Sequence, residues 1–143
     1  MGKPVKDPYC NLFVLENLPE NLKAEPCIFG IDEAGRGPLV YCLFVVPAKD
    51  HLLLRERFQA KDSKDMTPES RFRFSNLIFE NHPTNYGWLI GMLSPRKITE
   101  GMLRIPKYNL NEMSYDCIFD LLGTAFKFFQ NVEHVSFTYL DLP

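Results

Sequence analysis

Two neighbouring carboxylic acids, Asp32 and Glu33, are the residues whose types and spacing most clearly suggest chemistry. They follow the apolar run 27–31, and an ionised carboxylate beside apolar residues needs a partner or a metal ion. Carboxylate oxygens suit Mg²⁺ or Mn²⁺, and two such ions ~4 Å apart can activate water and stabilise the leaving oxygen in phosphodiester cleavage. A metal-dependent hydrolytic site is therefore one function that this pair can serve.

The residues after this pair, Gly35, Arg36 and Gly37, suit contact with a phosphate, because glycines leave backbone groups unshielded and a guanidinium binds phosphate oxygens. Two simpler interpretations stand beside this one. The segment can be a glycine turn whose Asp caps a helix and whose Glu faces solvent. It can also be a phosphate loop, although that motif needs Lys and then Ser or Thr where Arg36 and Gly37 stand, and two acids would repel phosphates.

A shared site for Asp32 and Glu33 places a condition on the backbone. Successive side chains of a continuing strand point to opposite faces of the sheet. The two carboxylates therefore meet only where the strand ends between them and the chain turns. Ala34 and Gly35 permit such a turn, so we expect both acids to point into a common pocket.

Short apolar runs and helix-start signals surround this segment. Thr67-Pro68 and Ser94-Pro95 are typical N-cap and first-turn pairs, and residues 109–129 keep apolar side chains at helical spacing. This order of elements predicts an α/β protein with a mixed sheet and helices packed on it. The expected strands are 27–31, 39–46, 85–93 and 135–140, and the expected helices are 67–80, a short one opening at 94–95, and 109–129.

The composition fits one folded domain. The chain has 143 residues, of which 45% are hydrophobic and 24% charged, and this excludes a disordered or collagen-like protein. We interpret residues 1–25 as a lead-in segment and residues 26–143 as the domain. The net charge of −2 provides no overall attraction to nucleic acid. No apolar run approaches the ~20 residues of a membrane span and no export signal is recognisable, so we expect an intracellular protein with no membrane segment.

Four segments carry a resemblance to a known family: Gly30-Ile31-Asp32-Glu33-Ala34-Gly35-Arg36-Gly37-Pro38, Asp62-Ser63-Lys64, Gly87-Trp88 with Leu93-Ser94-Pro95, and Lys107-Tyr108-Asn109-Leu110-Asn111. In this order they resemble type 2 ribonuclease H (ribonuclease HII), and more narrowly the catalytic A subunit of the eukaryotic enzyme. The resemblance implies a ribonuclease H-like fold and metal-dependent hydrolysis of the RNA strand of RNA/DNA hybrids, including cuts at ribonucleotides embedded in duplex DNA. It also implies two accessory subunits in eukaryotes and a nuclear role in DNA replication and repair.

The resemblance assigns roles residue by residue. Asp32 and Glu33 match the first two metal ligands of a four-acid set that holds Mg²⁺ or Mn²⁺. Gly35, Arg36 and Gly37 match the loop that senses the ribose 2′-hydroxyl, by which a protein tells RNA from DNA. Lys64 matches a segment near the catalytic centre, where it would contact a backbone phosphate.

The sequence departs from the family pattern near its C-terminus. Thr138 stands where the family has its third metal-binding aspartate, and a hydroxyl does not replace a carboxylate's charge. Asp141 is an odd number of residues away, so on a continuing strand it faces the other side. The family continues into a region with its fourth acid and subunit contacts, so we expect a partial domain whose C-terminal part is missing.

These departures predict that the 143-residue chain alone is slow or inactive. The alternative from another functional class is a non-catalytic truncated product, a splice form or incomplete gene model, that at most binds partner subunits or hybrid. A third hypothesis is a nucleotide-phosphate binder that uses residues 30–37.

Overall fold

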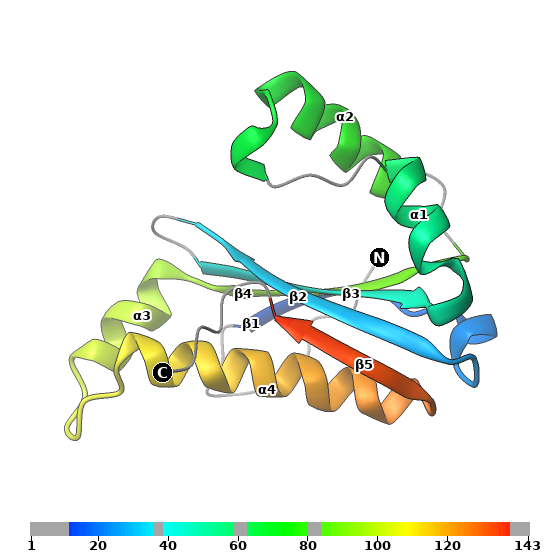
Figure 1. Ribbon diagram of the computed structural model, residues 1–143. Coiled ribbons are helices and arrows are strands. Elements are labelled where there is room, and N and C mark those ends of the chain that lie inside the picture. Colours follow the sequence, from blue (N-terminus) through cyan, green and yellow to red (C-terminus); the bar gives the residue numbers. More distant parts are fainter. Residues whose placement is uncertain (1–11, 36–38, 59–62, 80–83, 138–143) are drawn as a thin grey trace.

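The structure, a computed structural model, describes residues 12–35, 39–58, 63–79 and 84–137 (Figure 1). Its centre is a five-stranded sheet with the strand order β1-β4-β3-β2-β5. The strands are β1 (Leu12–Asn17), β2 (Cys27–Ala34), β3 (Leu39–Pro47), β4 (Gly87–Leu93) and β5 (Val132–Phe137). The helices are α1 (His51–Phe58), α2 (Pro68–Phe79), α3 (Pro95–Met102) and α4 (Leu110–Phe128), with short 3-10 turns at Glu20–Leu22, Ala48–Asp50 and Ser63–Asp65.

The sheet is mixed. β2, β3 and β4 are antiparallel neighbours, and β1 extends the sheet as an antiparallel partner of β4. β5 lies on the other side of β2 and runs parallel to it. A mixed sheet with helices against it confirms the predicted α/β class, and it brings the carboxyl ends of β2, β4 and β5 to the same end of the sheet.

The main core lies between one face of the sheet and α4, which runs beneath the strands in Figure 1. Every second residue of β4, and of β2 as far as Ile31, is buried, as the period of a half-buried strand requires. The apolar stripe of α4 meets this face, and the ring of Phe129 lies 5.6 Å from that of Phe29. The α4 residues that belong to this core are Met113, Cys117, Leu121 and Ala125.

A smaller cluster lies on the opposite face, where α1 and α2 pass above the strands (Figure 1). Its buried members are Val46, Phe58 and Tyr86, and the partly buried Phe74 and Ile78 of α2 pack against them. No residue of α2 is itself buried. The two faces of the sheet are therefore covered unequally.

The predicted helix starts are confirmed by their caps. The Thr67 side-chain oxygen accepts a hydrogen bond from the Ser70 N–H at 3.2 Å, and the Ser94 oxygen accepts one from the Lys97 N–H at 3.2 Å. Asn109 forms a complete capping box with Glu112. No helix in the described part of the chain combines the length and apolar composition that crossing a membrane needs.

Two expectations about the elements were wrong. We expected the ordered part to begin near residue 26, but β1 already pairs with β4 from Leu12 to Asn17, so part of the 1–25 segment is an edge strand of the sheet. The last strand was expected to begin at residue 135, but β5 (Val132–Phe137) begins three residues earlier, and the expected end at residue 140 lies outside the described residues. Helix α1 was not predicted at all, because its sequence has almost no one-sided apolar pattern, with most of its side chains exposed.

Candidate active site

The strand that carries Asp32 and Glu33 does not end between them. β2 continues to Ala34, and its ladder with β3 pairs Asp32 with Cys42 and Glu33 with Tyr41. Figure 1 shows β2 and β3 running side by side to this end of the sheet. Successive side chains of a paired strand alternate between faces, so the two carboxylates leave on opposite sides. The expectation that the chain turns between the acids was therefore wrong.

Asp32 lies on the face of the sheet that α1 and α2 cover in part, since it shares the strand face of Ile28, which packs in the smaller cluster. The side chain is exposed, and its Oδ1 accepts a hydrogen bond from the Glu33 N–H at 2.8 Å. Its neighbour across the ladder is Cys42 of β3, and the charge of Asp32 affects the pKa of that thiol. Burial, and then the negative charge of Asp32, raise the pKa of the Cys42 thiol to about 11.

Glu33 lies on the α4 face, the face of the buried residues Phe29 and Ile31. Its neighbour there is the buried Tyr41, whose hydroxyl donates a hydrogen bond to Ser114 Oγ of α4 at 2.6 Å. Burial raises the pKa of Tyr41, the bond to Ser114 opposes this, and the charge of Glu33 adds to the rise. The electrostatic partners of the two acids thus stand on different faces, in agreement with the backbone register.

A divalent cation fits this arrangement poorly. Mg²⁺ and Mn²⁺ need several oxygen ligands around one point, and carboxylates on opposite faces of a strand do not converge. Among the described residues, no group of three or more His, Cys, Asp or Glu side chains could hold a metal ion. The described part of the chain therefore does not by itself form the metal site that the sequence pattern predicts.

Three of the predicted substrate contacts, Gly35, Arg36 and Gly37, follow β2 in the sequence. Gly35 has a φ of 134°, a conformation that residues with a side chain rarely adopt, so the chain leaves the strand here, two residues beyond the expected point. Arg36 and Gly37 lie outside the described residues. Their predicted contact with the ribose stays a prediction.

Lys64 lies in the 3-10 turn Ser63–Asp65, which is separated by one residue, Met66, from the N-cap Thr67 of α2. Its side chain is exposed, as a residue that contacts a nucleic-acid backbone must be. The predicted contact with a phosphate stays a prediction.

The residues at the third-acid position also lie outside the described range. β5 pairs in parallel with β2 as far as Ile31 and Phe137, and Thr138 and Asp141 follow that point. Their predicted positions relative to Asp32 therefore stay predictions. The parallel pairing of β5 with β2 is the arrangement that would bring a third metal ligand after β5 close to Asp32.

Sequence reasoning missed a basic cleft between α1 and α2. It has a volume of about 710 Å³, and Arg57 of α1 and Arg73 of α2 line it. The available signal was the concentration of cations in residues 51–79, which hold six Lys and Arg against four Asp and Glu in a chain of net charge −2. That signal was overlooked because no motif marks it.

Comparison with known proteins identifies the relationship. The sequence pattern of the family described as Ribonuclease HII matches residues 29–137. The A subunit of ribonuclease H2 from Homo sapiens is 34% identical over 131 residues, which are 88% of this chain and 42% of that protein. The protein of the same name from Rattus norvegicus is 40% identical over 113 residues, 76% of this chain and 36% of its own length.

The similarity extends to fungi. The ribonuclease H2 protein of the same name from Neurospora crassa is 33% identical over 140 residues, 88% of this chain and 44% of that protein. The chain thus spans about two fifths of the length of the curated relatives it matches. Because the family pattern covers most of the chain, including the segment with Asp32 and Glu33, this chain belongs to the ribonuclease HII family.

Proposed function

We propose that this chain acts on RNA paired with DNA, as part of a type 2 ribonuclease H that hydrolyses the RNA strand of RNA/DNA hybrids and cuts at ribonucleotides embedded in duplex DNA. The observation that carries the proposal is the Ribonuclease HII match over residues 29–137. It includes both adjacent acids and the glycine turn at Gly35. The relatives are named as one subunit of ribonuclease H2, and this supports a further proposal that the chain works with accessory subunits. A nuclear location is proposed only because the proposed substrate contains DNA.

Within this function the residues have separate roles. Mg²⁺ or Mn²⁺ would supply activation of water and stabilisation of the leaving oxygen. Asp32 and Glu33 would provide carboxylate ligands once both face one point, which the described conformation does not allow. Gly35, with its positive φ, exposes the backbone next to Arg36 and Gly37 for close approach of a ribose. Lys64 would contact a backbone phosphate.

We also propose that the 143-residue chain alone cleaves slowly or not at all. The support is geometric: the ladder between β2 and β3 holds Asp32 and Glu33 on opposite faces. The described residues provide no cluster of three ligands to compensate. Two divalent cations would therefore be poorly neutralised, and at least one would bind weakly.

The experiment is an incubation of the purified chain with Mn²⁺ and a duplex that holds a single ribonucleotide, followed by electrophoresis of the labelled strand. We expect little or no product. Clear cleavage that Asp32→Asn abolishes would overturn the proposal of inactivity and support the nuclease function directly. Cleavage that persists in Asp32→Asn would instead indicate a contaminating nuclease, which a mock purification identifies.

A non-catalytic role is the second candidate function. The placement of Asp32 and Glu33 on opposite faces of the sheet favours it, because separated carboxylates do not form a metal site. The two candidates differ in metal binding. A catalytic chain shows saturable Mn²⁺ binding by calorimetry that is lost when Asp32 and Glu33 are both changed to Ala. A non-catalytic chain binds Mn²⁺ equally weakly before and after the change.

A further inference from the structure

The cleft between α1 and α2 is built from two helices that the sequence separates by a long connection. Its volume is about 710 Å³. The cations Arg57 and Arg73 come from different helices, and the hydroxyl side chains of Thr67 and Ser70 lie on the α2 side. The remaining lining is mostly apolar: Phe58, Met66, Phe74 and Leu77, with Asp65 and Asn76.

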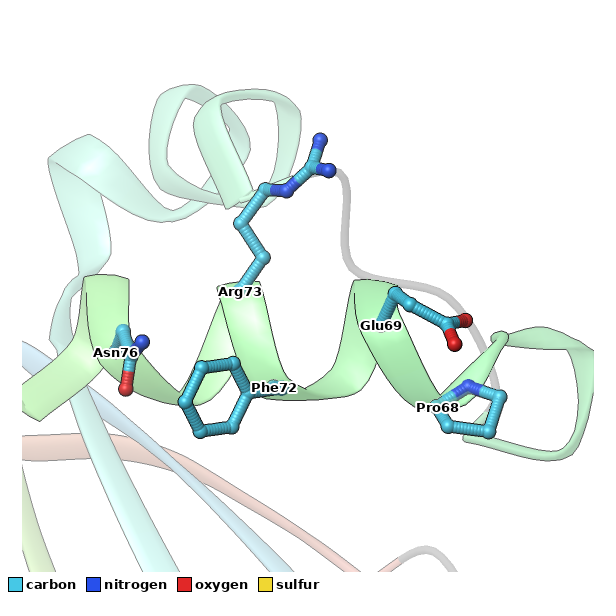
Figure 2. A pocket seen from close by; sticks show the side chains of 5 residues that line it. All are labelled: Pro68, Glu69, Phe72, Arg73 and Asn76. Atoms are coloured by element: carbon cyan, nitrogen blue, oxygen red, sulfur yellow. The ribbon is translucent and has the colours of Figure 1, made fainter.

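Arg73 stands between two hollows of α2. A shallower one, of about 560 Å³, is lined by Pro68, Glu69, Phe72, Arg73 and Asn76. Figure 2 shows the Arg73 side chain rising from α2 toward the ribbon of α1, away from Phe72, which points to the other side of the helix. The guanidinium is thus directed to the side of α2 where Arg57 lines the cleft.

The two guanidinium groups are available for a ligand. Within the described residues, neither Arg57 nor Arg73 forms an ion pair. The salt bridges found there are Lys49–Glu25 and Arg96–Glu100. Asp65 is the single acid among the residues that line the cleft. The charge of Arg57 also reaches the aromatic cluster below, since it opposes the rise in the pKa of Tyr86 that burial causes.

We propose that the α1–α2 cleft binds a backbone phosphate of a nucleic-acid duplex, with the guanidinium groups of Arg57 and Arg73 as its ligands. Guanidinium groups bind phosphate oxygens in a planar, bidentate geometry, and apolar walls strengthen such contacts by excluding water. The inference rests on the proposed function, which supplies the duplex. It also fits the fold, because the cleft lies on the side of the sheet that carries Asp32.

The test is a titration of the full chain with a short RNA/DNA hybrid and with the DNA duplex of the same sequence, by fluorescence anisotropy over a range of NaCl concentrations. Each phosphate contact contributes about 0.9 to the slope of log K against log salt. We expect Arg73→Gln and Arg57→Gln each to lower this slope by about one. Arg71→Gln is the matched control, since Arg71 is exposed on the same helix but does not line the cleft.

A change of opposite sign provides a second control. Asp65→Asn removes the acid from the cleft and should strengthen duplex binding at each salt concentration, because it removes repulsion of the phosphate. Equal slopes for Arg73→Gln and Arg71→Gln would overturn the proposal. A thermal-shift measurement with inorganic phosphate gives a second contrary outcome. If phosphate raises the melting temperature of the wild-type chain but not of Arg73→Gln, while the two proteins bind the duplex equally well, the cleft binds free phosphate and not the duplex backbone, and the proposal is overturned.

The outcomes separate this proposal from the proposed function. If hybrid and DNA duplexes bind equally and both depend on Arg73, the cleft binds phosphate as proposed and the selectivity for hybrids fails. If the hybrid is bound selectively but without dependence on Arg57 or Arg73, the cleft proposal fails and the selectivity stands. Absence of any duplex binding overturns the cleft proposal, and the cleavage assay then decides the proposed function.

Discussion

At the scale of single residues, the orientation of a carboxylate depends on where its strand stops. Asp32 and Glu33 are adjacent in sequence, but the pairing of β2 with β3 as far as Ala34 sends them to opposite faces. Asp32 then stands beside Cys42, and Glu33 beside Tyr41. Moving both acids to one side requires loss of ladder pairs at the end of β2, and every second pair of an antiparallel ladder exchanges backbone hydrogen bonds.

The thiol of Cys42 reports this geometry. Because the charge of Asp32 contributes to the raised pKa of Cys42, Asp32→Asn should lower that pKa and speed alkylation of Cys42 by iodoacetamide near pH 9. The gain should be modest, since burial is the larger cause. Glu33→Gln should leave the rate unchanged, because Glu33 lies on the other face. Peptide mapping by mass spectrometry separates Cys42 from the other thiols.

Equal acceleration by both variants would contradict the opposite-face geometry.

The raised pKa of Cys42 also has a consequence for stability. The thiol has a pKa of 9.0 when unperturbed and about 11 in the folded protein, so folding favours its neutral form. Its contribution to the free energy of unfolding is fully present below pH 9 and is lost as the pH rises through 11.

At the scale of elements, the helices are fixed by their ends and by how closely they approach one another. Asn109 accepts a hydrogen bond from the Glu112 N–H at 3.0 Å, and the Glu112 carboxylate accepts one from the Asn109 N–H at 2.9 Å. The close approach of α3 to α4 occurs at Gly101, where an added Cβ would overlap the end of Met113 and lie 3.3 Å from the Tyr108 carbonyl oxygen.

Two glycine substitutions test this packing. Gly123→Ala, in α4, places a methyl group where nothing lies within 4 Å, so it should raise the free energy of unfolding by about 0.5–1 kcal/mol through better helix propensity. Gly101→Ala should lower it, because overpacking costs about 1–3 kcal/mol and outweighs the gain in propensity. Urea unfolding measures both changes. Stabilisation by both substitutions would show that α3 and α4 are not in close contact at Gly101.

At the scale of the whole molecule, the two faces of the sheet differ in how firmly they are covered. The α4 face holds the main core, in which Phe29, Leu121 and Ala125 are almost wholly excluded from solvent. The α1–α2 face holds a small aromatic cluster, and Phe72 of α2 is 70% exposed. Local opening costs least where few apolar contacts are broken, so the layer with the proposed phosphate cleft should also be the one that opens most readily.

Hydrogen exchange measured by mass spectrometry tests this difference. We expect amides of α2 to exchange faster than those in the middle of α4, because α2 has no buried residue and α4 has four. Phe74→Ala removes a ring that lies 6.0 Å from that of Phe58 in α1, and it should accelerate exchange in α2 and α1 but not in α4. Equal protection of α2 and α4 in the wild-type chain would show that both faces are equally stable.

The sequence alone determined the mixed α/β class, most element positions and the family, because these depend on local patterns: apolar periodicity, N-cap residues such as Thr67 and Asn109, and one specific acidic segment. Only the tertiary structure decided the rest. Pairing with β3 extended β2 through Glu33 and directed the two acids to opposite faces. Pairing with β4 placed β1 at the edge of the sheet. Packing of α1 and α2 on one face of the sheet brought Arg57 and Arg73 to one cleft. Each of these depends on contacts between residues distant in sequence, which no local pattern encodes.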